Sequence, residues 1–514
     1  MAIHTVIKEN TYFDSVTLMT ISTRANELDF VKTAMVGMGT DMNIEVIRNV
    51  GLFTDSLNNV STGDLMIVVD IDEAGDSTEV LAEIDALFTQ KKSTGETDVI
   101  YKTLSGALEN NPSSNMVVIS VNGQFAYREA NQALDAGKHV MLFSDNVSIE
   151  EEKALKEKAH EKELLMMGPD CGTAIINGVG LCFANQVRSG DIGIVGASGT
   201  GSQEVSVQIH KHGYGVSQLI GTGGRDLSSE IGGIMMIDGI DALINDPQTK
   251  AILLVSKPPA KEVEEKILEK IAETEKPVVI YFIGSTLNES TLENVTFAHS
   301  SLEASLEVIK HSAEPVQKIA VYSDPTEAEL EEVKGKLVAD QQYVRGLFCG
   351  GTLCDELLYQ VMATAKEEVY SNNHPNADFK LGYASASKKH TILDFGDDEF
   401  TAGRPHPMID PSSRSQRLIE EAKDPEVAVI AMDFELGFGS HSDPAGVVLN
   451  AIEEAQSIAK KAGRYLPIVA YVLGTEEDEQ GVLDQRQKLL DLGVIVVDSN
   501  DALCRVTKTL IEGA

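Results

Sequence analysis

The sequence predicts an α/β protein with several parallel sheets, and three observations carry this prediction. Its 514 residues exceed what one hydrophobic core supports, so we expect about three or four domains. Short apolar runs alternate with amphipathic stretches along most of the chain, which is the pattern of repeated βα units. The composition, 42% hydrophobic and 24% charged, is that of an ordinary globular protein.

The predicted strands are short apolar runs bounded by turn-forming residues. In chain order they are 16–21, 65–71, 116–121, 139–143, 192–195, 251–255, 278–282, 318–322, 346–348, 427–432, 468–472 and 494–497. Amphipathic helices are expected between them. The clearest is 326–339, where apolar residues recur at helical spacing and Thr326 begins a capping pattern.

Changes in composition divide the chain into four predicted domains. Residues 87–95 and 312–318 are polar and turn-forming, and a softer break lies at GPDCG, residues 168–172. We therefore expect domains at 1–95, 96–167, 168–313 and 314–514. Two long stretches, 371–390 and 396–416, lack apolar periodicity, and long loops in compact α/β proteins often carry function.

The charge balance and the cysteines exclude several classes of partner and site. Eighty acidic and 42 basic residues give a net charge of -38, which repels nucleic acid and anionic membranes. The five cysteines have neither CxxC spacing nor paired histidines, so we expect reduced thiols and no metal site. Because the sequence shows neither a signal peptide nor an apolar run that could span a membrane, we expect a cytoplasmic protein.

A glycine-rich turn at 193–204 (GIVGASGTGSQE) joins an apolar run to a helical pattern. The first N–H groups of a helix lack internal partners, so small residues there let a phosphate approach. Ser198, Gly199 and Thr200 are the predicted phosphate-binding residues. The spacing fits neither a Rossmann fingerprint nor a P-loop, and the alternative is a tight turn that needs glycine only for its backbone. Residues 350–356 (GGTLCDE) repeat the pattern Gly-Thr-x-x-x-Glu and predict a second, related turn.

Another glycine turn lies at 221–226 (GTGGRD). There Gly223 and Gly224 would expose backbone amides beside the guanidinium of Arg225, which suits a carboxylate or a phosphate. A solvated surface arginine fits the same pattern. His299, between an apolar run and a helix, is either a phosphate carrier or general base, or a surface residue.

Loops in the C-terminal half supply further candidate substrate contacts. One long loop carries Arg404, His406 and Arg414, and the segment 435–441 (ELGFGSH) is again a strand followed by glycines. In α/β sheets, ligands bind at the carboxyl ends of strands, where these loops are expected.

Five ordered motifs resemble the α subunit of succinyl-CoA synthetase: MGPDCGT (167–173), GIVGASGTGSQE (193–204), LIGTGGRDL (219–227), NDPQTKAILL (245–254) and EKPVVIYFIG (275–284). The second half, with GLFCGGTLCDE, HTILDFGDDEF, AKDPEVAVIAMDFELGFGS and PIVAYVLG, looks like the ligase domain of that enzyme's β subunit, fused in one chain. Together with its N-terminus, the chain resembles the FdrA family.

The resemblance implies a domain plan. It consists of several Rossmann- or flavodoxin-like parallel-sheet domains in the succinyl-CoA synthetase arrangement. Residues 1–95 would be a ferredoxin-like α+β segment, 96–167 a unit like the CoA-binding domain, 168–313 an α-type ligase domain and 314–514 a β-type ligase domain.

The resemblance also implies a phosphate site. In that superfamily two helix N-termini, one from each half, face each other around the phosphate of a phosphohistidine. Carried over by position, the first is formed by Ser198, Gly199 and Thr200, and the second by the glycine turn at Gly437 and Gly439.

Three departures from the family change the expected chemistry. No part of the chain resembles an ATP-grasp module, so any nucleotide step would need another subunit. The N-terminal segment lacks a clear glycine loop for the phosphates of CoA and offers only GMGTD at 37–41. Lys257 stands where the family has an acidic residue that orients the phosphohistidine, and His299 lies several residues late. We therefore expect phosphate binding without phosphohistidine transfer.

The FdrA resemblance implies a component of oxamate carbamoyltransferase in allantoin (purine) catabolism, which converts oxalurate and phosphate to oxamate and carbamoyl phosphate. His299, Arg225 and Arg404 would be its catalytic residues, with phosphate or carbamoyl phosphate as ligand and no cofactor. The alternatives are an ADP-forming acyl-CoA synthetase that uses CoA and ATP with a separate ATP-grasp partner, and a non-catalytic scaffold. We expect a small anionic acyl or carbamoyl substrate and further protein subunits or a homo-oligomer, but no nucleic acid and no membrane.

Overall fold

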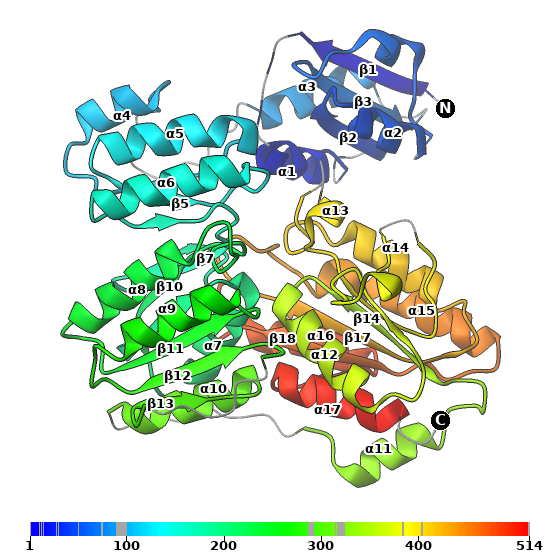
Figure 1. The fold of residues 1–514 in the computed structure, drawn as a ribbon. Helices are drawn as coiled ribbons and strands as arrows, with labels where there is room; N and C mark the ends of the chain where they lie inside the picture. Colours follow the sequence, from blue (N-terminus) through cyan, green and yellow to red (C-terminus); the bar gives the residue numbers. More distant parts are fainter. Residues whose placement is uncertain are drawn as a thin grey trace. The chain divides into compact units, whose positions relative to one another are not determined.

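The chain divides into two units, Met1–Lys102 and Thr103–Ala514, in the computed structural model (Figure 1). The structure describes all residues except 1, 10, 12, 14, 27, 29, 50, 73–75, 89–99, 286–291, 314, 316–323, 383–384, 402–404 and 512–514. The division of 103–514 at residues 167 and 313 stays a prediction. No helix in the described part of the chain is long and apolar enough to cross a membrane.

The first unit is an antiparallel sheet covered by helices on both faces, as the expected α+β segment requires. Its strands are β1 (Ala2–Lys8), β2 (Val31–Met38) and β3 (Leu65–Ile71), with β3 in the middle. Side chains of β3 alternate between two cores, one shared with α1 (Ser15–Asn26) and α3 (Ser77–Leu87), the other with α2 (Asp41–Asn49).

The predicted strand at 16–21 is wrong, because these residues begin α1. Val16, Thr17 and Ile21 are β-branched and favour a strand locally. Leu18, Ile21 and Ala25, however, lie three and four residues apart and are all buried in the first core, so tertiary packing at helical spacing decides the structure.

The second unit begins with a small parallel sheet and continues into a larger one. The small sheet has the order β4-β5-β6, with β4 (Met116–Ile119), β5 (His139–Leu142), β6 (Met166–Met167) and helices α4 (Leu104–Asn110), α5 (Gly123–Asp135) and α6 (Ile149–Glu161). The large sheet has the order β13-β12-β11-β9-β10-β7-β8 and is parallel apart from the hairpin β7–β8 at one edge.

Helices cover both faces of the large sheet. Its strands are β7 (Thr173–Ile176), β8 (Val179–Cys182), β9 (Ser189–Gly196), β10 (Val216–Gly221), β11 (Ala251–Ser256), β12 (Val278–Phe282) and β13 (Val295–Phe297). One core contains side chains of α8 (Ile234–Asn245) and α9 (Lys261–Ile271), and the other contains those of α7 (Gly199–Lys211) and α10 (Ser301–Val308).

A six-stranded parallel sheet follows, in the order β15-β16-β14-β17-β18-β19. Its strands are β14 (Tyr343–Phe348), β15 (Val369–Tyr370), β16 (His390–Asp394), β17 (Val427–Glu435), β18 (Ile468–Leu473) and β19 (Ile495–Val497). The helices are α11 (Glu327–Lys334), α12 (Gly351–Thr364), α13 (Asp398–Thr401), α14 (Ser412–Glu421), α15 (Leu449–Lys461), α16 (Val482–Asp491) and α17 (Asn500–Ile511). Short 3-10 turns lie at Asp55–Asn59, Ile309–His311, Ala377–Phe379 and Gly446–Val448.

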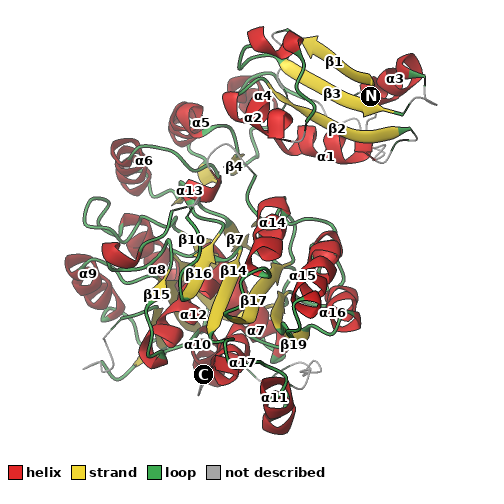
Figure 2. Cartoon of the chain, turned by 90° about the vertical axis from the view of Figure 1, so that its right-hand side faces the viewer, coloured by secondary structure: helices red, strands yellow, loops and turns green. Residues whose placement is uncertain are grey.

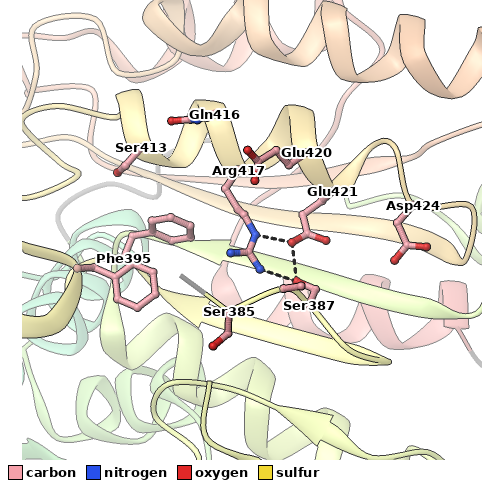
Figure 3. Close-up of a pocket in the computed structure, with 11 residues that line it drawn as sticks. Ser385, Ser387, Phe395, Ser413, Gln416, Arg417, Glu420, Glu421 and Asp424 are labelled. Atoms are coloured by element: carbon pink, nitrogen blue, oxygen red, sulfur yellow. Dashed lines mark hydrogen bonds and ion pairs between the residues drawn. The ribbon is translucent and has the colours of Figure 1, made fainter. Parts of the chain in front are cut away.

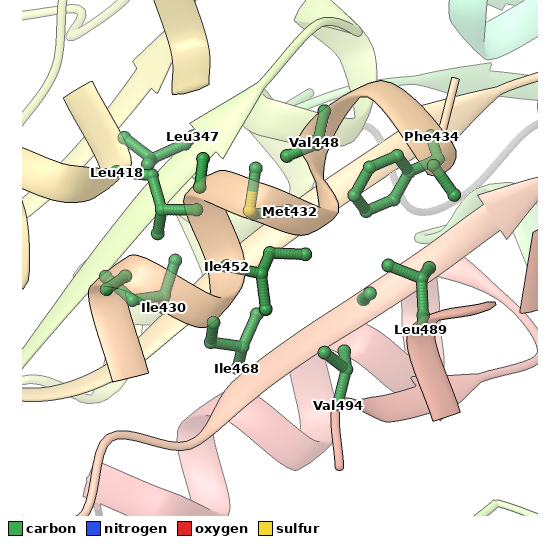
Figure 4. Packing of buried hydrophobic residues seen from close by; sticks show 14 of the residues in the cluster. Leu347, Leu418, Ile430, Met432, Phe434, Val448, Ile452, Ile468, Leu489 and Val494 are labelled. Atoms are coloured by element: carbon green, nitrogen blue, oxygen red, sulfur yellow. The ribbon is translucent and has the colours of Figure 1, made fainter. Parts of the chain in front are cut away.

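Two cores sandwich this sheet. Helices α14, α15 and α16 lie to one side of β14 and β17 (Figure 2), where Leu418, Ile452 and Leu489 pack against the strands (Figure 4). Helices α12 and α17 bury their apolar side chains against the other face.

Most predicted strands are confirmed, and β3 and β12 have the expected bounds. Strand 318–322 lies outside the described residues. The expected helix at 326–339 is shorter, because α11 ends at Lys334, but Thr326 forms the predicted capping box with Glu329.

Two buried glutamates join the two large sheets reciprocally. Glu204 of α7 accepts a hydrogen bond from Tyr471 of β18 at 2.5 Å and one from the backbone N–H of Asn500, where α17 begins, at 3.3 Å. Burial raises the pKa of Glu204 to about 7.

Glu356 of α12 makes the corresponding bonds from the C-terminal half to the preceding half. It accepts hydrogen bonds from Tyr281 of β12 and, at 2.8 Å, from the backbone N–H of Ser301, where α10 begins. Each glutamate thus ends the Gly-Thr-x-x-x-Glu pattern of its own half and bonds to the other half.

We expect Tyr471→Phe to lower the free energy of unfolding by about 1–3 kcal/mol, because it leaves a buried carboxyl oxygen of Glu204 without its donor. Urea unfolding measures the change. Tyr370→Phe is the control, since among the described residues its hydroxyl bonds to the exposed Glu368 alone, and it should change the value by less than about 0.5 kcal/mol. Equal effects of the two substitutions would contradict a special role for the reciprocal bond.

Candidate functional site

The N-terminus of α7 keeps unused hydrogen-bond donors. Strand β9 ends at Gly196, and Ser198 caps the helix by accepting from the backbone N–H of Gly201 at 3.1 Å. The N–H groups of Gly199 and Thr200 have no acceptor within the described residues. These donors carry the positive end of the helix dipole, so this end suits an anion.

The N-terminus of α12 lies directly against that of α7. The hydroxyls of Ser198 and Thr352 share a hydrogen bond, and the N–H of Thr352 donates to the hydroxyl of Thr200 at 3.4 Å. Gly201 permits this approach, because a Cβ at that position would lie 2.9 Å from a methyl carbon of Thr352. The repeated turn at 350–356 is therefore the helix end that faces 198–200.

Gly437 and Gly439, expected to form the second helix N-terminus, lie instead in a loop after β17. The N–H and the carbonyl of Gly437 both bond to the side-chain amide of Gln480, at 3.3 and 2.7 Å. Its φ of 126° requires glycine, and a Cβ on Gly439 would lie 2.9 Å from the ring of Phe183. Both glycines thus serve the packing of this loop, and the next helical turn begins only at Gly446.

Carboxylates surround the N-terminus of α12. Asp433 of β17 accepts from the backbone N–H groups of Cys349 and Gly350, both at 2.8 Å, and pairs with Arg414 at 2.8 Å. A Cβ on Gly351 would lie 2.6 Å from a carboxyl oxygen of Asp394. The protein's own acids therefore take the place of an external anion at this helix.

Lys257 brings a cation to the same junction. It follows β11, and its ammonium lies 3.0 Å from the carboxylate of Asp355 on α12. Burial alone would lower the pKa of Lys257, but Asp355 and Asp394 hold it above its ordinary value. Val255, two residues earlier, would touch a side chain on Gly201, so the end of β11 borders the first turn of α7.

Two of the three expected catalytic residues, His299 and Arg225, form hydrogen bonds away from this junction. His299 is exposed at the start of α10, where its backbone N–H donates to Glu303 at 2.6 Å. Arg404 lies outside the described residues. Arg225 donates to the carboxylate of Glu152 at 3.0 Å and to the carbonyl of Val147 at 2.7 Å.

The glycines beside Arg225 have packing roles. Gly223 has a φ of 87°, and a Cβ there would lie 2.2 Å from the carbonyl oxygen of Pro169. Gly224 faces the carboxyl of Asp170, whose pKa burial raises to about 7. The binding of phosphate by these glycines remains a prediction, and the neighbouring carboxyl group opposes it.

His406 lies in the loop before α14, whereas Arg414, expected in that loop, lies within α14. The His406 ring packs on Phe183 with 5.3 Å between ring centres, and burial lowers its pKa to about 4, so it is neutral. Arg414 is buried and bonds to Asp433. Cys349, Thr352, Asp394 and Asp433 were not predicted as site residues, and the repeated Gly-Thr pattern was the one signal that pointed to Thr352. Glu435 begins the segment 435–441, which was expected to contact substrate.

A cavity of ≈ 480 Å³ lies elsewhere in the C-terminal half, along α14 (Figure 3). Arg417 donates to Glu421 at 2.5 Å and to Ser387 at 2.7 Å, and Ser387 donates to Glu421. These bonds tie Arg417, the cation of this cavity, to Glu421 and Ser387 of its own lining.

Three protein families match parts of the chain: the AllF, heavy metal-associated domain at 1–102, the CoA binding domain at 187–284 and the CoA-ligase at 347–510. All five cysteines lie beyond the first of these segments. The uncharacterized protein YahF of Escherichia coli (strain K12) is 54% identical over 500 residues, 97% of each chain.

Relatives with named reactions match shorter stretches. The ADP-forming succinate–CoA ligase subunit alpha 1 of Archaeoglobus fulgidus is 30% identical over 192 residues, 36% of this chain and 64% of that one. The malate–CoA ligase subunit alpha of Methylorubrum extorquens is 26% identical over 198 residues, also 36% and 64%. These matches correct the expected enzyme class: they point to CoA ligases, and the expected carbamoyltransferase activity is wrong.

We expect Asp394→Asn to reduce the pH dependence of stability. Burial raises the pKa of Asp394 from 3.8 to about 7, so between these values the folded protein holds a proton that the unfolded chain releases. The free energy of unfolding therefore falls as pH rises through this window, by up to about 1.4 kcal/mol per pH unit for one group. Urea unfolding across the window should show a shallower decline in the variant.

Asp378→Asn is the control for this substitution, because Asp378 is exposed. It should leave the slope of stability against pH as in the unsubstituted protein. An unchanged slope in Asp394→Asn would show that Asp394 does not hold a proton in the folded state.

Proposed function

Because the chain belongs to the family of YahF, within the FdrA and succinyl-CoA ligase superfamily, we propose that it is the ligase component of an ADP-forming acyl-CoA synthetase. It acts on a small carboxylic acid, and a separate ATP-grasp protein supplies the nucleotide step. The matches to the CoA binding domain and the CoA-ligase family support this proposal. The AllF match supports ureide (allantoin) catabolism, expected from the FdrA resemblance, as its setting.

The observation that carries the proposal is the pair of free N–H groups at the start of α7. With the hydroxyls of Ser198 and Thr200 beside them, the N–H groups of Gly199 and Thr200 can bind phosphoryl oxygens. When an acyl phosphate reacts with the thiol of CoA, sulfur bonds to the carbonyl carbon and phosphate leaves. Donors at this helix end would stabilise the negative charge on the departing phosphate.

The surrounding charges support a phosphate at α7 rather than at α12. Asp394 and Asp433 crowd the first residues of α12, and a phosphate there would meet their carboxyl groups. Lys257 pairs with Asp355 of α12, so its charge is already offset on that side. We therefore assign a one-sided phosphate site, with no phosphorylated form of the exposed His299.

Gly199→Val tests this assignment. A Cβ at Gly199 would meet no atom closer than 3.7 Å, so the fold can accept a side chain, which would cover the free N–H groups. We expect inorganic phosphate to raise the melting temperature of the unsubstituted chain and to have little effect on the variant. With ATP, CoA, the ATP-grasp partner and a panel of small carboxylic acids, thioester formation should fall by about 100-fold or more.

Gly63→Val is the matched control, because a Cβ there also has open surroundings, with its nearest contact at 3.8 Å. It should keep both the response to phosphate and thioester formation. If phosphate stabilises Gly199→Val as well as the unsubstituted chain, the site is not at α7. If no acid in the panel yields a thioester, the synthetase assignment itself fails.

A further inference from the structure

Three potential metal ligands converge beside the first turn of α12. A sulfur of Cys349 and one carboxyl oxygen each of Asp433 and Glu435 lie within 4.8 Å of one another. Strands β14 and β17 are paired in parallel, so Cys349, just after β14, comes to the same sheet edge as the end of β17. Asp433 and Glu435 are two residues apart on β17 and share one face. All three side chains are buried, with at most 2% exposed.

Glu435 supplies a second, independent observation. Both of its carboxyl oxygens are buried, and neither has a hydrogen-bond partner within the described residues. Burying a carboxyl group without a partner is costly, and a bound cation is one way to offset that cost. Glu435 is aimed at Cys349 and Asp433.

Asp433 retains one coordinating position. Its Oδ1 accepts from Cys349 N–H and Arg414, whereas among the described residues its Oδ2 accepts from Gly350 N–H alone, which leaves one lone pair. Gly350 keeps a side chain out of this cluster, because a Cβ there would lie 2.9 Å from Glu435 Oε1 and 3.1 Å from Asp433 Oδ2.

We propose that Cys349, Asp433 and Glu435 bind a thiophilic divalent cation of the zinc type. A thiolate with two carboxylates is a donor set that zinc accepts, and three protein ligands leave a fourth position open. When ionised, the three ligands carry three negative charges and Arg414 offsets one, so a divalent cation neutralises the cluster. The site goes beyond the proposed ligase function, which names no metal on this chain.

A second group with similar spacing, His210, Glu476 and Glu477, does not offer the same chemistry. Nδ1 of His210 accepts from the backbone N–H of Arg188 at 2.9 Å, so the proton is on Nε2, which donates to Glu476 at 3.1 Å. Neither ring nitrogen has a free lone pair for a metal.

Cobalt titration tests the proposal on the full chain after removal of metal with a chelator. Co²⁺ bound by a thiolate gives a sulfur-to-metal charge-transfer band in the near ultraviolet. We expect one equivalent of Co²⁺ to develop this band and one equivalent of Zn²⁺ to remove it. Cys349→Ser should abolish the band and weaken Co²⁺ binding by at least about 10-fold.

Cys354→Ser is the matched control, because Cys354 is an equally buried thiol on α12 outside the cluster, and it should keep the band. Glu435→Gln, which preserves side-chain shape, should weaken Co²⁺ binding while circular dichroism stays that of the folded chain. Absence of the band in the folded, unsubstituted protein would overturn the proposal. The same holds if the band persists in Cys349→Ser or is lost in Cys354→Ser.

Discussion

The exchange of glutamates between the two large sheets is the constraint on which the rest of the second unit depends. Glu204 and Glu356 are buried, and each accepts hydrogen bonds from the opposite half, one from a tyrosine hydroxyl and one from the N-terminus of a helix. Because an unpartnered buried carboxyl group is costly, the two halves are held in the one arrangement that satisfies both. That arrangement brings the N-termini of α7 and α12 together.

The two helix ends that meet there have opposite electrostatic character. The end of α7 has N–H groups without an acceptor among the described residues, whereas the end of α12 is enclosed by Asp394, Asp433 and Glu435. A shared backbone pattern thus serves two purposes. The α7 end suits a phosphoryl group, and the acids around α12 suit a cation, so the phosphate site and the metal site proposed here are consequences of one divergence in side-chain charge.

The sequence was sufficient for much of the fold and for half of the site. Strands β3 and β12 were predictable because all their residues except Asp70 are apolar. Helix α1 was not predictable, because its β-branched residues favour a strand although it packs as a helix. Ser198, Gly199 and Thr200 follow from local glycine spacing. The acids around α12 do not, since Cys349 and Asp433 are 84 residues apart and only the register of β14 with β17 brings them together. For the same reason, the second helix N-terminus was wrongly predicted at Gly437 and Gly439.

The covalent continuity of the two halves has a thermodynamic consequence. Relatives such as the succinate–CoA ligase subunit alpha of Archaeoglobus fulgidus are named as single subunits, whereas here both ligase-like halves belong to one polypeptide. The effective concentration of one half at the other is therefore set by the covalent connection between them and does not depend on expression level. Dilution cannot expose Glu204 or Glu356 to solvent, so the junction of α7 and α12 stays assembled at any protein concentration at which the chain is folded.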